Sequence, residues 1–378
     1  MDLLKKFPWT KNFDFLLIGA PILIAAAGLV TMNSFAGNDY FFEKQIVIVA
    51  ISAFISLLIS LIDFRFLHRT QVVVSFYVLV ISLLAFLLIA GQVVKGAKGW
   101  LNLGFFSLQP SEFAKLALIL LLSKYFARRH IEIANIKHII ISGIYAFILF
   151  VFVALQPDFG SAVIIFLIWL GMVLVSGISK KHLFLVFAIG ALSFGGLWMG
   201  VFQNYQKDRI RNFLHPLADI RGTGYNAYQS TIAVGSGQIM GKGVGYGTQS
   251  KLQFLPEYET DFVFAAFAEE WGFIGVIFLF FLYGVIVWRS VRIALHANTN
   301  FEALFALGFA IFVISHFTIH VGMNIGLLPV TGITVPFMSY GGSHILVEFI
   351  MLGILMGMRR YERPAHKHEI YNEMLDIQ

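Results

Sequence analysis

Apolar residues occur along this chain in long blocks, separated by short segments that are charged or rich in Gly and Pro. A helix needs about 17–25 predominantly apolar residues to cross the hydrocarbon core of a bilayer. The blocks approach or reach this length. The pattern therefore predicts an all-α polytopic membrane protein with about ten transmembrane helices, near residues 14–32, 45–62, 71–90, 110–126, 138–155, 161–177, 183–202, 262–288, 301–322 and 342–358.

The composition supports this class and limits the chemistry. Hydrophobic residues make up 58% of the chain, charged residues make up 13%, and the mean hydropathy is +0.80. A chain this apolar is typical of a membrane protein and not of one soluble core. The chain has no Cys, which excludes disulfides, thiolate metal sites and cysteine nucleophiles. The first block lacks a small-residue cleavage site, so we expect a retained span within a single domain, residues 1–378.

Lys and Arg are distributed unequally between alternate connecting segments, and short cytoplasmic loops retain positive charge. The short loops on one side hold only Lys44, Lys95 and Lys98. The segments on the other side hold Lys5, Lys6, Lys11, Arg65, Arg69, Lys124, Arg128, Arg129, Lys137, Lys180, Lys181, Arg289, Arg292, Arg359, Arg360, Arg363 and Lys367. We therefore predict cytoplasmic termini, a cytoplasmic tail at 359–378 and one large extracytoplasmic loop at 203–261. The net charge of +6 reflects this topology, and we do not expect a nucleic-acid partner.

The stretch FLPEYETDFVFAAFAEEWGFIGV, residues 254–276, places carboxylates at the start of the predicted eighth span and inside it. Asp261 falls at the outer mouth, and Glu269 and Glu270 follow about 12–13 Å deeper along a straight helix axis. Four cations of the preceding loop could hold a phosphate-bearing ligand beside a carboxylate base: Lys207, Arg209, Arg211 and Arg221. The simpler alternative is that Asp261 complements the helix macrodipole.

Further ionisable residues fall within the predicted spans or between them. Glu112 and Lys115 share one face of the fourth span, where a charged pair either serves function or locks helix packing. Asp158 lies in a Pro-Asp-x-Gly turn, which turn chemistry alone can explain. His316 and His320 have metal-ligand spacing but lack an H-E-x-x-H pattern, which favours core or cavity histidines.

The glycine-rich segment GSGQIMGKGVGYG, residues 235–247, is not a Walker motif. Only three residues separate Gly237 from the Gly241-Lys242 pair, and Gly243 stands where Ser or Thr is required. No Rossmann fingerprint follows a predicted strand either. We expect these glycines to let an outer loop bend closely over a substrate or partner. The substrate would arrive already activated, for example as a sugar diphosphate attached to a lipid.

Several longer motifs carry a family resemblance. They are AKGWLNLGFFSLQPSEFAK, LQPDFGSA, RNFLHPLADIRGTGYNAYQS, GSGQIMGKGVGYGTQSKLQFLPEYETDFVFAAFAEEWG and GLLPVTGITVPFMSYGGS. In this order they resemble the shape, elongation, division and sporulation (SEDS) family of bacterial membrane proteins over nearly the whole chain. The wording of GTGYNAYQS and GKGVGYGTQS is more similar to the rod-shape branch of the family than to its division branch.

The resemblance implies a ten-span glycosyltransferase of the bacterial cytoplasmic membrane. Such an enzyme polymerises lipid II into peptidoglycan strands on the outer face during cell elongation. The expected partners are a class B penicillin-binding protein, other elongation-complex proteins and membrane lipids. The resemblance makes Asp261 the catalytic residue. The expected cavity or substrate residues are Glu112, Lys115, Asp158, Lys207, Arg209, Arg211, Glu257, Ser339 and Gly341.

Two other functions remain open from the sequence. A lipid II flippase could use Glu112, Lys115 and Asp158 as gate residues, and such transporters commonly contain an internal repeat, which we do not find. A scaffold for a penicillin-binding protein would tolerate Asp261→Ala. The sequence defines no cofactor, but a divalent cation such as Mg²⁺ or Mn²⁺ could assist Lys207, Arg209 or Arg211 at the leaving diphosphate.

Overall fold

The computed structural model describes residues 14–34, 39–94, 97–102, 107–128, 135–200, 204–215, 224–252 and 254–360. Long helices coincide with all ten predicted blocks: α1 (Phe15–Asn33), α2 (Asp39–Ser60), α3 (Thr70–Ala90), α4 (Pro110–Ala127), α5 (Ile136–Leu155), α6 (Phe159–Val175), α7 (Lys180–Gly200), α11 (Val263–Leu295), α12 (Asn300–Asn324) and α13 (Gly342–Arg360).

Seven of the described helices are long and apolar enough to cross a membrane: α1, α2, α3, α5, α11, α12 and α13. The helix α6 is apolar but shorter, and α4 and α7 fall outside this set. The chain is therefore a mostly helical, multi-pass membrane protein. The count of ten spans remains a prediction.

Local sequence explains where several helices begin. Asp14, Asn135, Asp158 and Thr299 are the N-cap residues of α1, α5, α6 and α12, and each side chain accepts a backbone N–H of the first turn. Pro110 occupies the first turn of α4, where its missing N–H costs no helical hydrogen bond. These caps satisfy backbone N–H groups that have no partner within the helix.

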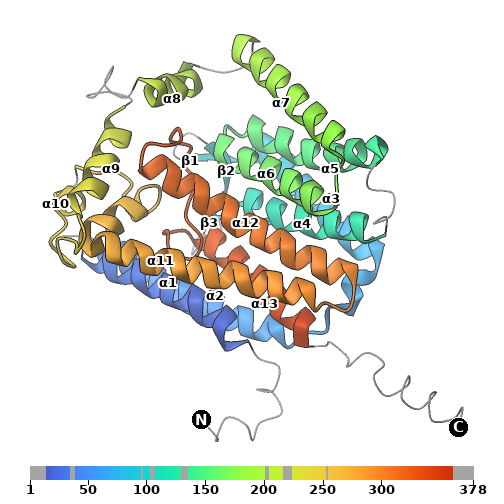
Figure 1. Ribbon diagram of the computed structural model, residues 1–378, viewed down its shortest axis with the longest axis horizontal. Coiled ribbons are helices and arrows are strands. Elements are labelled where there is room, and N and C mark those ends of the chain that lie inside the picture. Colours follow the sequence, from blue (N-terminus) through green and yellow to red (C-terminus); the bar gives the residue numbers. More distant parts are fainter. Residues whose placement is uncertain are drawn as a thin grey trace, which may run out of the picture.

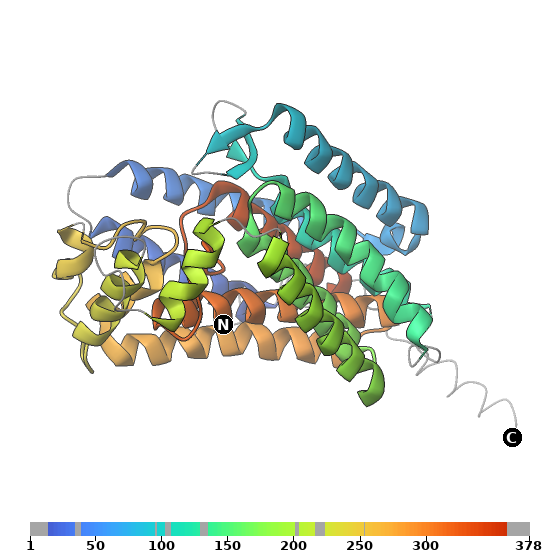
Figure 2. The same ribbon diagram turned by 90° about the horizontal axis from the view of Figure 1, so that it is seen from above.

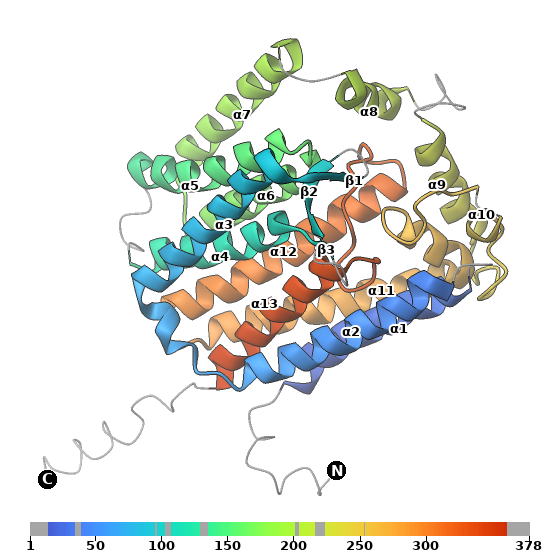
Figure 3. The ribbon, with the colours of Figure 1, turned by 180° about the vertical axis from the view of Figure 1, so that it is seen from behind.

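The helix α12 lies at the centre of the bundle. It packs against α4, α6, α11 and α13, while α2 packs on α13 and α1 packs on α11 (Figure 1). Figure 2 shows α11 and α3 on opposite faces of the molecule, with α13 between them. The helix α7 leans away from the rest of the bundle (Figure 3).

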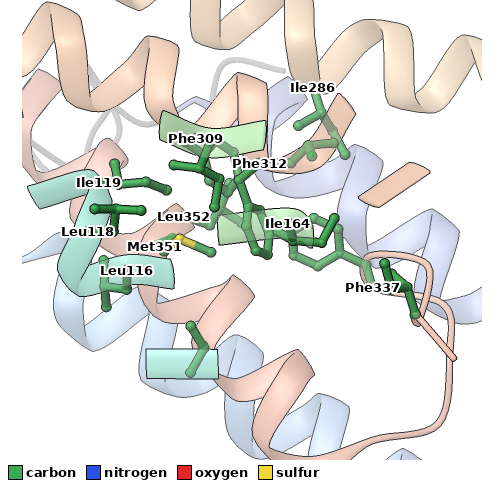
Figure 4. Packing of buried hydrophobic residues seen from close by; sticks show 14 of the residues in the cluster. Leu116, Leu118, Ile119, Ile164, Ile286, Phe309, Phe312, Phe337, Met351 and Leu352 are labelled. Carbon is green, nitrogen blue, oxygen red and sulfur yellow. The ribbon is translucent and has the colours of Figure 1, made fainter. Parts of the chain in front are cut away.

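The core consists of large apolar side chains from these central helices. Figure 4 shows Ile119 of α4, Phe309 and Phe312 of α12, and Leu352 of α13 packed together. All four are fully buried. Close packing of α4, α12 and α13 therefore fixes the positions of their ends, and these ends carry the polar residues of the candidate site.

One end of the bundle is joined by an ion-pair cluster. Asp14, 4% exposed, accepts a hydrogen bond from Arg289 Nε at 2.9 Å and also bonds Arg359. The start of α1, the last part of α11 and the end of α13 therefore lie at the same end of the molecule. This agrees with the prediction that alternate connecting segments lie on opposite sides of the membrane, since it placed Arg289 and Arg359 on the same side.

The segments between long helices contain shorter elements. They are η2 (Phe64–His68), β1 (Gln92–Val94), β2 (Ala97–Asn102), β3 (Ser107–Leu108), α8 (Asn204–Leu214), α9 (Tyr225–Ser236) and α10 (Thr248–Lys251). The strands form a small antiparallel sheet in the order β1-β2-β3, beside α3 and α4. The all-α prediction missed this sheet. Two of its strands, β1 and β3, have only three and two residues, too few to show an alternation of apolar and polar positions.

Candidate active site

Residues 255–262 form a tight turn that presents Asp261 just before α11. The backbone of Glu257 has a φ of 50°, and its carbonyl accepts the N–H groups of Thr260 and Phe262, both at 3.1 Å. The Glu257 carboxylate accepts Thr260 Oγ1 at 3.0 Å. Asp261 is half-buried and precedes the N-cap residue, Phe262. Asp261 therefore adjoins the N-terminus of α11, and the macrodipole alternative remains open.

The apolar residues of the turn anchor it to the core. Leu255 and Phe262 are at most 1% exposed, and Tyr258 is 8% exposed. Burial, together with the nearby Glu259 carboxylate, raises the pKa of the Tyr258 phenol above its usual value. The phenol is therefore protonated at neutral pH. Asp261 remains half-exposed on a turn whose other side is held in the protein interior.

Asn324, at the end of α12, holds the backbone on both sides of the junction with α11. Its Nδ2 donates to the Asp261 carbonyl at 3.0 Å, and its Oδ1 accepts Ala265 N–H at 3.1 Å. Asn324 is fully buried. On the far side of the carboxylate, a Cβ at Gly332 would lie only 3.6 Å from Asp261 Oδ2. Asn324 was not among the predicted site residues, although a polar residue beside an apolar span is a signal of function.

A second anchor comes from the segment before α13. Ser339 Oγ donates to the Thr260 carbonyl at 2.9 Å and accepts Val335 N–H at 2.9 Å. Tyr340 N–H donates to the Glu259 carbonyl at 2.8 Å. Ser339, a predicted site residue, therefore lies directly against the turn and holds its main chain.

Gln45 of α2 extends this anchor to Gly341. Its Nε2 donates to the Ser339 carbonyl at 3.0 Å, and its Oε1 accepts Gly341 N–H at 3.4 Å. Gln45 is 1% exposed. Gly341 therefore contributes through its backbone, one residue before α13 begins.

Asp158 lies on the other side of the segment that contains Gly332. Its Oδ1 caps α6 at Ser161 N–H, 3.0 Å away, and its Oδ2 accepts Gln109 Nε2 at 3.1 Å and Ser111 Oγ at 3.2 Å. A Cβ at Gly160 would lie 2.8 Å from the carbonyl of Thr331. The Asp158 turn and the Asp261 turn therefore contact the same short segment, residues 331–333.

Glu112 and Lys115 form a buried ion pair, with Lys115 Nζ 2.7 Å from Glu112 Oε1. The pair is part of a longer network that the sequence did not predict. His344 Nδ1 lies 2.9 Å from Glu112 Oε2, and its Nε2 lies 2.7 Å from Glu348 Oε1. Glu348 Oε2 in turn accepts the backbone N–H of Phe337 at 2.7 Å. Polar residues inside the predicted tenth span were the signal that could have revealed this network.

The network continues toward the Asp261 turn through the main chain. Phe337 has a φ of 62° and is fully buried, and Ser339 follows it by two residues. Non-helical backbone at membrane depth is tolerated where protein surrounds it and supplies hydrogen bonds. The 335–341 segment therefore links the buried charges of α4 and α13 to the turn that carries Asp261.

Lys207, Arg209 and Arg211 all lie on α8, which Figure 1 shows at the edge of the molecule, between α7 and α9. Arg211 pairs with Asp208 of the same helix at 3.2 Å. Arg221, the fourth predicted cation, lies outside the described residues. A meeting of these cations with a ligand beside Asp261 remains a prediction.

Glu269 and Glu270 lie on α11 about two helical turns after Asp261, as their spacing predicted, but this helix is not straight and breaks just after them. The backbone of α11 is non-helical at Gly272, with φ 65° and ψ −169°. Glu269 Oε1 accepts Lys242 Nζ at 2.7 Å and Thr248 N–H at 2.9 Å. Glu270 Oε1 accepts Gly245 N–H at 3.0 Å and also bonds Ser34, the C-cap of α1. The pair therefore lies level with the end of α1.

These contacts also show what the glycine-rich segment, residues 235–247, packs against. It lies over the two carboxylates of α11, with which Lys242 and Gly245 form the bonds given above. Its contact with a substrate or partner remains a prediction.

His316 and His320 are buried core histidines, as their spacing without a further motif predicted. Their Nδ1 atoms lie 3.1 Å from the Thr334 carbonyl and 2.7 Å from the Ile333 carbonyl, respectively. Among the described residues, no group of three or more His, Cys, Asp or Glu side chains is arranged to hold a metal ion.

The chain matches known proteins over most of its length. The family model for FtsW, RodA and SpoVE, described as "Cell cycle protein", matches residues 8–364. The chain is 36% identical over 291 residues to peptidoglycan glycosyltransferase MrdB of Escherichia coli (strain K12), covering 77% of this chain and 78% of that protein.

Two solved structures share the fold. A chain described under "Structural coordination of polymerization and crosslinking by a peptidoglycan synthase complex" aligns with a TM-score of 0.80 and 29% identity, over 93% of this chain and 100% of that chain. The rod shape determining protein RodA of Thermus thermophilus aligns with a TM-score of 0.71 and 27% identity, over 94% of this chain and 100% of that chain. The protein therefore belongs to the FtsW, RodA and SpoVE family, the SEDS family that its motifs predicted.

Proposed function

We propose that this protein is a peptidoglycan glycosyltransferase that polymerises lipid II, with Asp261 as its general base. The family membership and the activity named for MrdB support the reaction class. The observation that favours Asp261 is the way its turn is held. Asn324, Ser339 and Tyr340 bond the main chain of residues 259–261, while the Asp261 side chain remains half-exposed.

The reaction is a single displacement with inversion at the anomeric carbon. The 4-hydroxyl oxygen of the acceptor GlcNAc attacks C1 of the donor MurNAc, and Asp261 takes up the hydroxyl proton as the new glycosidic bond forms. The bond from C1 to undecaprenyl diphosphate breaks, and the diphosphate leaves with the electron pair. A carboxylate is a weak base for an alcohol, but it needs to accept the proton only late, when the oxygen has become acidic.

The remaining predicted residues take supporting roles. Cations of α8 (Lys207, Arg209 and Arg211) stabilise the leaving diphosphate. Glu257 shapes the turn through Thr260, and Ser339 and Gly341 hold the turn and the start of α13. Glu112, Lys115 and Asp158 fix the ends of α4, α6 and α13 around the site.

These contacts favour the polymerase over a flippase. In a flippase, Glu112, Lys115 and Asp158 would exchange partners as the pathway alternates. Here Asp158 caps α6 and accepts two further hydrogen bonds, and the Glu112 carboxylate bonds both Lys115 and His344. Groups with this many partners are costly to separate inside a membrane.

We further propose that the enzyme acts on the outer face of the bacterial cytoplasmic membrane during cell elongation. The similarity to RodA and the loop motifs GTGYNAYQS and GKGVGYGTQS support a role in maintaining the rod shape of the cell. A class B penicillin-binding protein is the proposed partner, since the structural relative belongs to a complex of polymerization and crosslinking. Such a partner would crosslink the strands that this protein makes.

The test is strand synthesis from labelled lipid II by purified protein, with and without the penicillin-binding partner. Asp261→Asn keeps the size of the side chain but cannot take up a proton, so it should abolish polymerisation. Asp63→Asn is the matched control, because Asp63 lies between α2 and α3, away from the Asp261 turn. Near-normal synthesis by a well-folded Asp261→Asn protein would remove the residue as the base and restore the flippase and scaffold alternatives.

A further inference from the structure

The loop between α9 and α10 supplies the hydrogen bonds that α11 loses at its break. In an unbroken helix, the N–H of Phe273 would bond the carbonyl of Glu269. It instead donates to the Gln238 carbonyl at 2.9 Å, and Ile274 N–H donates to the Ile239 carbonyl at 3.2 Å. The loop therefore caps the N-terminus of the second half of α11.

The same loop caps the C-terminus of the first half. Lys242 N–H donates to the Glu269 carbonyl at 2.9 Å, and Gly243 N–H donates to the Glu270 carbonyl at 3.0 Å. Backbone groups left unpaired in lipid cost several kcal/mol each. Because the loop pairs these carbonyls, the break in α11 can lie at the edge of the hydrocarbon region.

Two glycines make this close approach possible. Gly241 has φ 80° and Gly272 has φ 65°, conformations that side chains disfavour. A Cβ at Gly241 would lie 2.2 Å from the Glu270 carbonyl oxygen, and a Cβ at Gly272 would lie 2.1 Å from Gly241 N. The loop is therefore locked into α11 and cannot move away from it as an independent lid.

The tip of this loop presents two large apolar side chains, Ile239 at 66% exposure and Met240 at 77% exposure. The second half of α11 begins beside them with Phe273, Ile274 and Ile277, all more than half exposed. The backbone bond from Ile274 to Ile239 joins the two surfaces directly. The helix α11 is one of the candidate membrane spans, so its exposed apolar side chains face lipid.

We propose that Ile239 and Met240 enter the hydrocarbon edge of the lipid bilayer and anchor the loop there. The surface of the tip is continuous with the lipid-facing surface of α11 and has the same apolar chemistry. The nearest cation of the loop, Lys242, is neutralised by Glu269 at 2.7 Å. Its charge therefore opposes insertion less than an unpaired cation would.

The absence of Cys permits a direct test. Single variants Ile239→Cys and Met240→Cys are labelled with a nitrobenzoxadiazole dye and reconstituted into phosphatidylcholine–phosphatidylglycerol vesicles. Two quenchers are compared: a doxyl group on a lipid acyl chain, and iodide in the water. Ile277→Cys on the exposed face of α11 is the lipid control, and Lys251→Cys on α10 is the water control.

Both tip labels should match the Ile277 label in doxyl quenching, with iodide quenching reduced well below that of the Lys251 label. The two positions give independent readings, and melting curves exclude misfolded variants. Iodide quenching equal to that at Lys251 would place the tip in water and overturn the proposal. Protection from both quenchers would also overturn it, because a second protein surface would then cover the tip. The outcome does not depend on whether Asp261 is the catalytic base.

Discussion

Two groups of carboxylates lie only eight residues apart along the chain, and the protein holds them in opposite ways. At the 255–262 turn, hydrogen bonds from Asn324, Ser339 and Tyr340 hold main-chain carbonyls, and the Asp261 side chain is half-exposed. At the break in α11, hydrogen bonds go to the carboxylates themselves as well as to the main-chain carbonyls, and Glu269 is fully buried.

This difference separates a reactive carboxylate from a structural one. A base must present its oxygens to a substrate while its backbone stays fixed, because small displacements of a catalytic group are costly to the rate. A structural carboxylate gives up its lone pairs to local donors. The five donors to Glu269 Oε1 are Lys242 Nζ, Thr248 N, Thr248 Oγ1, Gln249 N and Ser236 Oγ. Glu269 is thus held through its own carboxylate, whereas Asp261 is held through its backbone with the side chain partly exposed, the arrangement that we propose for the base.

The largest effect on stability should come from a third carboxylate, Glu112. In Glu112→Ala, Lys115 and His344 lose their shared partner in the interior, which should cost about 3–5 kcal/mol of unfolding free energy. A double-mutant cycle with Lys115→Met should show strong coupling, measured by thermal or denaturant unfolding in detergent. Additive effects of the two substitutions would show that the interaction between Glu112 and Lys115 adds nothing to the free energy of unfolding. Glu43→Ala, at an exposed position of α2, is the neutral control.

Asn324→Ala should lower the rate of polymerisation by about 10–100-fold, because the backbone of Asp261 loses its anchor and the carboxylate shifts. We expect the loss mainly in kcat, with a smaller change in KM, since Asn324 is buried away from substrate. Asn135→Ala is the matched control, because Asn135 caps the start of α5. A normal kcat in folded Asn324→Ala protein would contradict the view that the turn must be held.

Lys242→Met should have a smaller effect, about 1–2 kcal/mol of stability, because Glu269 keeps the backbone donors Thr248 and Gln249. The rate per folded molecule should remain near that of the unmodified protein. The control is Lys251→Met, whose exposed side chain donates a hydrogen bond to the Gly245 carbonyl. A large loss of rate at unchanged stability would move the α11 break into the catalytic machinery.

The orientation of both carboxylate groups can be tested without disturbing either of them. A cysteine at Lys251 should react with an impermeant thiol reagent added to intact cells, whereas one at Arg128, past the end of α4, should not. The unequal distribution of Lys and Arg is the basis for this expectation. Labelling at Arg128 but not at Lys251 would reverse the topology and place Asp261 on the cytoplasmic side.

The sequence predicted the features that depend on neighbouring residues. Helix positions follow from apolar blocks, and the Glu112–Lys115 pair follows from its spacing of three residues on one helix. The features it missed join distant segments. His344 meets Glu112 across 232 positions of sequence, and Ser339 meets Thr260 across 79. In the sequence, Gly272 looks like any other glycine in an apolar block. The helix breaks there because backbone groups on either side of Gly272 form hydrogen bonds with residues 238–243, which are distant in sequence.

The central claim is tested most directly by measuring Asp261→Asn and Glu269→Gln side by side, for both lipid II polymerisation and thermal unfolding. The account predicts that Asp261→Asn loses about 100–10,000-fold in rate at an unchanged melting temperature, as expected for removal of a general base. Glu269→Gln should melt at a lower temperature and keep a near-normal rate per folded molecule. A near-normal rate for folded Asp261→Asn, or an equal loss of rate in a Glu269→Gln protein of normal melting temperature, would contradict it.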